Sequence, residues 1–185
     1  MKIISWNARG LNSQAKYRIL KRKIQCHKPE IMFLQETKCS SPNITNLCRK
    51  LGSHMEVLEN ESQGREGGLA TIWDSREIQM LSAEANKHFM VVEFQPIGNS
   101  GSFLCINIYS PQKLEDKITF LETLSRIIRR YPRSKCILGG DFNMITTLLE
   151  KKGGLRKRNR DAEAFTNFIE TVKLVDIYPK SGLYT

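Results

Sequence analysis

The chain has 185 residues, the length of one domain with a sizeable core, and its 40% hydrophobic and 26% charged content exclude a disordered chain. Its formal net charge of +10 indicates a polyanionic partner, with a nucleic acid as the first candidate and an acidic membrane surface as the second. Five scattered cysteines without a CxxC pair favour free thiols in a reducing compartment over a disulfide framework or a zinc site. With no signal-peptide core and no apolar run long enough to span a membrane, we expect an intracellular protein.

Four segments have the apolar spacing of helices. The first covers 13–27, with Ser13 as the expected N-cap, and the second covers 42–51. The third covers 114–131 and is closed by Pro132. The last helix is marked by apolar residues at i, i+3, i+4 and i+7, namely Phe165, Phe168, Ile169 and Val172.

Strand-like runs outnumber the helices. They cover 2–7, 31–36, 54–59, 68–73, 77–81, 89–94, 103–109 and 135–143. The four runs between Gly67 and Tyr109 alternate with turn residues, which predicts an antiparallel meander, and the buried run at 135–143 is expected to lead into a Gly-Gly-Asp turn. The predicted fold class is α+β over 1–185, a four-layer α/β/β/α sandwich of two packed, mainly antiparallel sheets with outer helices.

Polar side chains stand near the carboxyl ends of four of these runs. They are Asn7, Glu36, Asp141 with Asn143, and Asn107 with Tyr109. Strand ends of this kind can converge on one mouth, where ligand sites are built. Carboxylate oxygens suit Mg²⁺, which takes one or two protein carboxylates plus waters and substrate oxygens. Taken singly, each residue is typical of a turn or cap; their conjunction predicts a magnesium site supplied by Glu36 and Asp141.

One stretch of the chain is densely basic. Six of the ten residues at 151–160 are Lys or Arg and none is acidic: Lys151, Lys152, Arg156, Lys157, Arg158 and Arg160. Such a run is usually a solvated loop. Beside a phosphodiester site it would also contact phosphates and make the affinity sensitive to salt.

The ordered motifs SWNARGLN, LQETK, GGLATIW, NIYSP, GGDFN and SGLYT span nearly the whole chain. This series resembles the motif set of the exonuclease–endonuclease–phosphatase superfamily. The spacing of LQETK, the NIYSP form and the EKKGG after GDFN are most similar to the endonuclease domains of non-LTR (LINE-type) retrotransposons. The resemblance implies a Mg²⁺-dependent enzyme, with Mn²⁺ as a possible substitute, that hydrolyses DNA in the nucleus.

The same resemblance implies a role for each matching residue. Glu36 resembles the principal Mg²⁺ ligand, and Asn7 the amide that helps to hold the metal. Asp141 resembles the carboxylate that orients or deprotonates the attacking water. Asn143 resembles the amide at the scissile phosphate and Tyr109 a phosphate-side donor. Thr185 is similar to a threonine that lies at the DNA surface.

The family pattern continues with a final Ser-Asp-His, and no histidine here matches it; the histidines are His27, His54 and His88. The resemblance therefore implies a domain without its last strands, with an unpaired sheet edge and with impaired or absent catalysis. Two other interpretations stay open at this point. One is a non-catalytic nucleic-acid-binding remnant held by the basic run, and the other is a lipid or inositol phosphate phosphodiesterase of the same superfamily.

Overall fold

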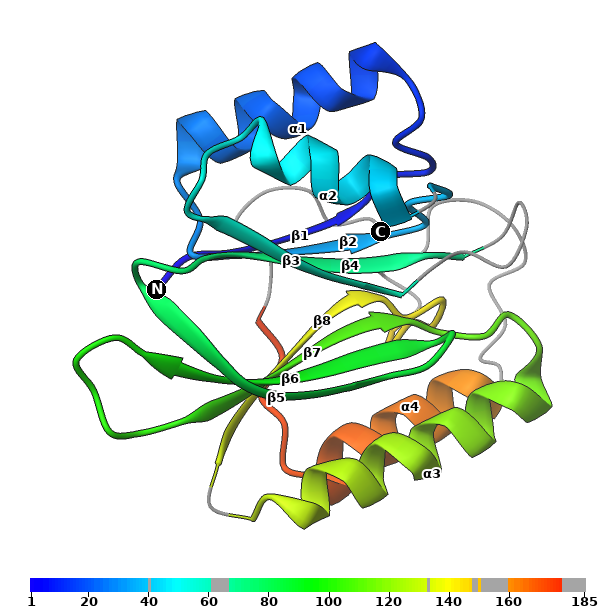
Figure 1. Ribbon diagram of the computed structural model, residues 1–185. Coiled ribbons are helices and arrows are strands. Elements are labelled where there is room, and N and C mark those ends of the chain that lie inside the picture. The colour runs from blue at the N-terminus through cyan, green and yellow to red at the C-terminus, as the bar shows by residue number, and fades with distance from the viewer. Residues whose placement is uncertain (40, 61–66, 133, 148–149, 151–159, 178–185) are drawn as a thin grey trace. The chain divides into compact units, whose positions relative to one another are not determined.

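The computed structural model describes residues 1–39, 41–60, 67–132, 134–147, 150 and 160–177 (Figure 1). The chain divides into two compact units. The first consists of Met1–Tyr109 and Ser134–Asp141. The second consists of the described parts of Ser110–Arg133 and Phe142–Thr185.

The first unit contains two helices and eight strands among its described residues. In chain order they are β1 (Ile3–Asn7), α1 (Gln14–His27), β2 (Ile31–Gln35), α2 (Ser41–Arg49), β3 (Met55–Asn60), β4 (Leu69–Asp74), β5 (Ile78–Ala85), β6 (Phe89–Pro96), β7 (Phe103–Tyr109) and β8 (Lys135–Asp141). The second unit contains α3 (Leu114–Arg130) and α4 (Arg160–Thr171). The predicted helices and strands are therefore all present, with boundaries that shift by a few residues.

Helix α1 begins and ends as its sequence predicts. The Ser13 hydroxyl accepts a 3.3 Å hydrogen bond from the backbone N–H of Lys16, which satisfies one of the unpaired amides of the first turn. At the other end Lys28 adopts a left-handed conformation and its N–H bonds to the carbonyl of Ile24. Leu20 and Ile24 form the buried face of the helix.

The strands form two mixed sheets, with the orders β1-β2-β4-β3 and β5-β6-β7-β8. The pairs β1–β2 and β7–β8 are parallel, and the other pairs are antiparallel. The two sheets pack face to face through side chains such as Phe33, Trp73, Phe94 and Phe103. Helices α1 and α2 cover the other face of the first sheet (Figure 1). The α+β sandwich of two packed sheets with helices is confirmed.

The predicted meander between Gly67 and Tyr109 is wrong in its first step. β4 pairs with β2 and β3 in the first sheet, and only β5, β6 and β7 form a meander. The chain passes from one sheet to the other in the short turn after Asp74. Strand periodicity and turn residues are the same whether the next strand joins the same sheet or the facing one, so the sequence pattern alone does not separate the two cases.

The Gly-Gly-Asp turn predicted after residue 138 is also corrected, because Gly139, Gly140 and Asp141 continue β8. Nor is β8 a buried strand: its residues are half-buried or exposed, as expected for the edge strand that it forms among the described strands. Gly139 lies against the first sheet, where a Cβ would come within 2.9 Å of the Phe33 ring. Gly140 has φ +147, and a Cβ there would come within 2.0 Å of the Ile108 carbonyl oxygen. The two glycines thus allow β8 to approach both neighbours closely.

Candidate functional site

Two parallel strand pairs carry the predicted site residues to one place in the first unit. β1 and β2 run in register from Ile3 and Ile31 to Asn7 and Gln35, and Glu36 follows directly. β7 and β8 end with Tyr109 beside Asp141. Because parallel strands present their carboxyl ends at the same edge of a sheet, each pair delivers two polar side chains together.

The side-chain amide of Asn7 joins the two carboxylates. Its Nδ2 donates to Glu36 Oε1 at 2.9 Å and to Asp141 Oδ2 at 2.6 Å. Its Oδ1 accepts from the backbone N–H of Arg9 at 3.1 Å, which fixes the orientation of the carboxamide. Asn7, Glu36 and Asp141 come from both sheets, so this contact ties the sheets together at the site.

The loop that carries Glu36 is held by backbone hydrogen bonds. Glu36 has φ +49, an uncommon conformation for a residue with a side chain, and its carbonyl accepts from Gly10 N at 2.7 Å. The next two amides, of Thr37 and Lys38, bond to the carbonyls of Gly68 and Gly67. These bonds extend the β1–β2–β4 network beyond the strands and hold the loop in its strained conformation.

Lys38 is a site residue that sequence reasoning missed. Its Nζ lies 3.1 Å from Glu36 Oε2. Burial raises the pKa of the Glu36 carboxyl, but hydrogen bonds from Asn7 and Lys38, the Lys38 charge and a hydrogen bond from Tyr109 outweigh it, so the pKa lies below its ordinary value. Glu36 is therefore ionised at neutral pH. The signal available in the sequence was a lysine two residues after the glutamate in LQETK.

The structure separates Asn107 from the site. Asn107 is fully buried between the sheets, where Nδ2 donates to the carbonyl of Ala70 at 2.9 Å and Oδ1 accepts from Gln35 Nε2 at 2.7 Å. Tyr109, two residues further on, is half-buried and bonds to Glu36. Of the two polar residues near the end of β7, Asn107 therefore belongs to the core and Tyr109 to the candidate site.

Asn143 belongs to the second unit. There it is exposed, has φ +49 and donates from Nδ2 to the carbonyl of Ser110 at 3.0 Å. Arg160 is exposed at the start of α4. The other predicted DNA-contacting residues lie outside the described residues: Lys151, Lys152, Arg156, Lys157, Arg158 and Thr185.

The oxygen donors at the site fit a hard divalent cation. Glu36 and Asp141 supply two carboxylates, and Mg²⁺ usually takes one or two from a protein. Asn7 turns its NH₂ group toward both carboxylates, so in this arrangement it orients them, and its role as a metal ligand stays a prediction. Within the described part of the chain, no group of three or more His, Cys, Asp or Glu side chains is placed to hold a metal ion.

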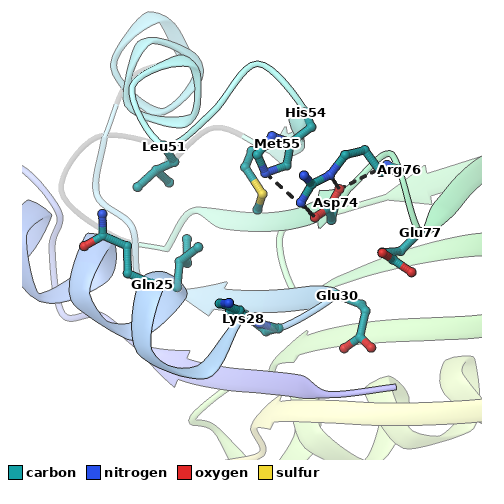
Figure 2. Close-up of a pocket in the computed structure, with 11 residues that line it drawn as sticks. Gln25, Lys28, Glu30, Leu51, His54, Met55, Asp74, Arg76 and Glu77 are labelled. Atoms are coloured by element: carbon teal, nitrogen blue, oxygen red, sulfur yellow. Dashed lines mark hydrogen bonds and ion pairs between the residues drawn. The ribbon is translucent and has the colours of Figure 1, made fainter.

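A cavity of about 480 Å³ opens at the opposite end of the first sheet (Figure 2). It lies beside the end of α1, the residue before β2 and the end of β4, and its lining includes Lys28, Glu30, His54 and Asp74. Asp74 Oδ2 accepts from Arg76 Nη2 at 2.6 Å and lies 3.8 Å from His54 Nε2. The lining of the cavity carries both signs of charge and none of the predicted site residues.

Among the described helices, none combines the length and the apolar content that a membrane-spanning helix needs.

Known structures share this fold at low sequence identity. An AP endonuclease from Archaeoglobus fulgidus superposes with a TM-score of 0.70 at 18% identity, over 91% of this chain and 70% of that one. D. rerio TDP2 complexed with single strand DNA product gives 0.61 at 16% identity, over 94% of this chain and 65% of that one. The mannosyl-6-phosphatase Bt3783 of Bacteroides thetaiotaomicron VPI-5482 gives 0.65 at 13% identity, over 89% and 69%.

This chain therefore spans about two thirds of the length of these proteins. At such identities the likeness shows a common fold. The model of the Endonuclease/Exonuclease/phosphatase family matches residues 4–183, which include every element described above except the first residue of β1. The chain belongs to the Endonuclease/Exonuclease/phosphatase family.

Proposed function

We propose that the protein is a divalent-metal-dependent endonuclease of the retrotransposon type, which hydrolyses phosphodiester bonds of nuclear DNA. The observation that carries the proposal is the Asn7 amide, which bonds to the carboxylates of Glu36 and Asp141 from two different sheets. Members of this family generally depend on a divalent metal. The LQETK, NIYSP and EKKGG forms support the retrotransposon class.

The proposed reaction needs an activated water and neutralisation of charge on the phosphate. Glu36, ionised at neutral pH and oriented by Asn7 and Lys38, would hold the metal. When bound, Mg²⁺ or Mn²⁺ supplies positive charge to the phosphoryl oxygens and to the leaving alkoxide. Asp141 accepts a proton from water as the water oxygen attacks phosphorus and the P–O bond to the leaving group breaks. Asn143 and Tyr109 are the proposed donors to the phosphate.

The charge of α1 favours a polyanionic substrate. The helix carries no Asp or Glu, and its five basic residues are Lys16, Arg18, Lys21, Arg22 and Lys23. These five charges equal half of the net charge of +10. Lys16 and Lys23 lie over the Trp6 ring, at 5.5 Å from its centroid. Arg18 and Arg22 are exposed, one turn apart. Like charges at this spacing destabilise an isolated helix, and a bound phosphate backbone would neutralise them.

The test is nicking of supercoiled plasmid DNA by the purified protein with Mg²⁺ or Mn²⁺. We expect slow nicking that EDTA and Glu36→Ala both abolish. Nicking unchanged by Glu36→Ala would refute the proposed metal site. If DNA binds without nicking, and binding survives EDTA and Glu36→Ala, the protein is a non-catalytic nucleic-acid-binding member of the family. Preferential binding to phosphoinositide vesicles over DNA would instead indicate a lipid phosphate substrate.

A further inference from the structure

Lys117 is a buried cation in the second unit. It lies in the first turn of α3, and only 6% of the residue is exposed. Its Nζ donates to the backbone carbonyl of Asn143 at 2.7 Å and to Asp161 Oδ2 at 2.9 Å. These two bonds join α3 to the loop after β8 and to α4.

A charged lysine side chain is unfavourable at this position unless specific interactions compensate for it. Burial removes the ammonium group from water, and the positive end of the helix dipole disfavours a cation in the first turn. Asp161 compensates for both effects. One of its carboxylate oxygens accepts from Lys117, and the other accepts from the backbone N–H of Ala162 at 3.0 Å. The ion pair is thus fixed at both partners.

The group that this pair holds is the backbone of Asn143. Asn143 adopts φ +49, a left-handed conformation that asparagine tolerates better than most residues with a side chain. Its side-chain Nδ2 is bonded to the carbonyl of Ser110, and the ring of the preceding Phe142 packs against Phe165 with centroids 5.1 Å apart. Lys117 adds a charged donor to the carbonyl of Asn143 itself.

We propose that Lys117 is a positioning residue for Asn143: its ammonium group, bonded directly to the Asn143 carbonyl, holds the left-handed backbone that directs the Asn143 carboxamide. The inference rests on the proposed function, in which that carboxamide contacts the scissile phosphate. Lys117 acts only through Asn143, so its removal should lower kcat because the donor is misplaced, with little change in the KM for DNA. A shift of about 1 Å in a reacting group can reduce the rate about 100-fold.

The experiment compares Lys117→Met with Asp161→Asn in the full chain. Both variants break the ion pair, and both should lower the Tm, but only Lys117→Met removes the bond to the Asn143 carbonyl. We expect kcat for plasmid nicking, measured well below each Tm, to fall about 10- to 100-fold in Lys117→Met and less than threefold in Asp161→Asn. In an Asn143→Ala background Lys117→Met should cause no further loss of kcat.

One further measurement tests the positioning role independently of the proposed function. The side-chain amide resonance of Asn143 should shift and broaden in Lys117→Met but stay in place in Arg76→Ala, which breaks an ion pair in the first unit. That readout decides the inference even if the wild-type protein nicks no DNA, a result that would count against the proposed function alone. An unmoved Asn143 resonance, an unchanged kcat in Lys117→Met, or additive losses in the double variant would each overturn the positioning role.

Discussion

Asn7 and Asp141 are hydrogen-bonded at 2.6 Å although 134 residues separate them in the chain and they end strands of different sheets. The same amide group also binds Glu36. A neutral donor between two carboxylates reduces their mutual repulsion and sets the directions of their oxygens. The site therefore depends on the packing of the two sheets as much as on the residues that form it.

Asn7→Ala should impair chemistry far more than stability. Loss of hydrogen bonds to charged groups lowers the free energy of unfolding by about 1–3 kcal/mol, whereas misplacement of two carboxylates should reduce nicking about 100-fold and weaken Mg²⁺ binding. Calorimetric Mg²⁺ titration, nicking rates and thermal unfolding measure these effects. Ser5→Ala is the control, because Ser5 bonds to Gln35 on the same pair of strands without touching the carboxylates. Equal losses of activity in both variants would contradict this role of Asn7.

Gly140→Ala should destabilise the protein more than Gly139→Ala. A Cβ at Gly140 meets main chain at 2.0 Å and also requires a positive φ, whereas at Gly139 it meets the Phe33 ring at 2.9 Å. Overpacking of this kind costs about 1–3 kcal/mol, and backbone strain adds about 1–2 kcal/mol at Gly140. Urea unfolding should also show that Phe33→Leu partly rescues Gly139→Ala. Gly10→Ala controls for strain alone, since φ is +92 there and no atom lies within 4 Å.

Asn107→Ala should lower stability and leave the chemistry of the folded protein intact. The substitution removes the donor to the Ala70 carbonyl and the shorter of two bonds of Gln35 Nε2, which keeps its bond to Ser5. An unsatisfied buried polar group costs about 1–3 kcal/mol, and the loss should lie in that range. Chemical denaturation measures it, with kcat per folded molecule as the second readout. A loss of kcat without a loss of stability would contradict the structural role and assign Asn107 to the catalytic site.

Arg18→Glu with Arg22→Glu should weaken DNA binding in a salt-dependent manner. Each phosphate contact contributes about 0.9 to the slope of log K against log salt concentration, so loss of two contacts should reduce the slope by about 2. Fluorescence anisotropy between 50 and 200 mM salt covers the useful range. Arg126→Glu with Arg129→Glu changes the same charge on exposed residues of α3 and serves as the control. Equal effects from both pairs would mean that only net charge matters.

Asp74 should stabilise the protein at neutral pH and lose this contribution in acid. The hydrogen bond from Arg76, together with the His54 and Arg76 charges, holds the pKa of Asp74 below its ordinary value despite the opposing effect of burial. The contribution is therefore complete above the unfolded pKa of about 3.9 and disappears as pH falls through the lower folded value. Urea unfolding from pH 6 to pH 2.5 should show the gap between wild type and Asp74→Asn closing below about pH 4. Glu56→Gln, which removes a carboxylate from an exposed residue of β3, is the matched control.

The sequence by itself determined the elements and the family, and it pointed to the residues of the candidate site. Alternating and helical apolar patterns are local, so helices and strands such as α1 and β7 lie where they were predicted. The ordered motifs led to the family, which the match over residues 4–183 shows. Oxygen-bearing residues at strand ends also led to Asn7, Glu36, Asp141 and Tyr109, which the structure brings together.

Only the tertiary structure decided which strand joins which sheet and which strand-end residue turns inward. β4 and β5 are adjacent in sequence yet lie in different sheets. An apolar strand is buried equally well in either of two packed sheets, so the local sequence pattern does not decide which sheet it joins. Asn107 and Tyr109 lie on one strand two residues apart, but the first is fully buried and bonds to Gln35 and Ala70 of the facing sheet, whereas the second is half-buried and bonds to Glu36. The Lys117–Asp161 pair could not be read from the sequence either, since its partners are 44 residues apart and meet only where α3 packs against α4.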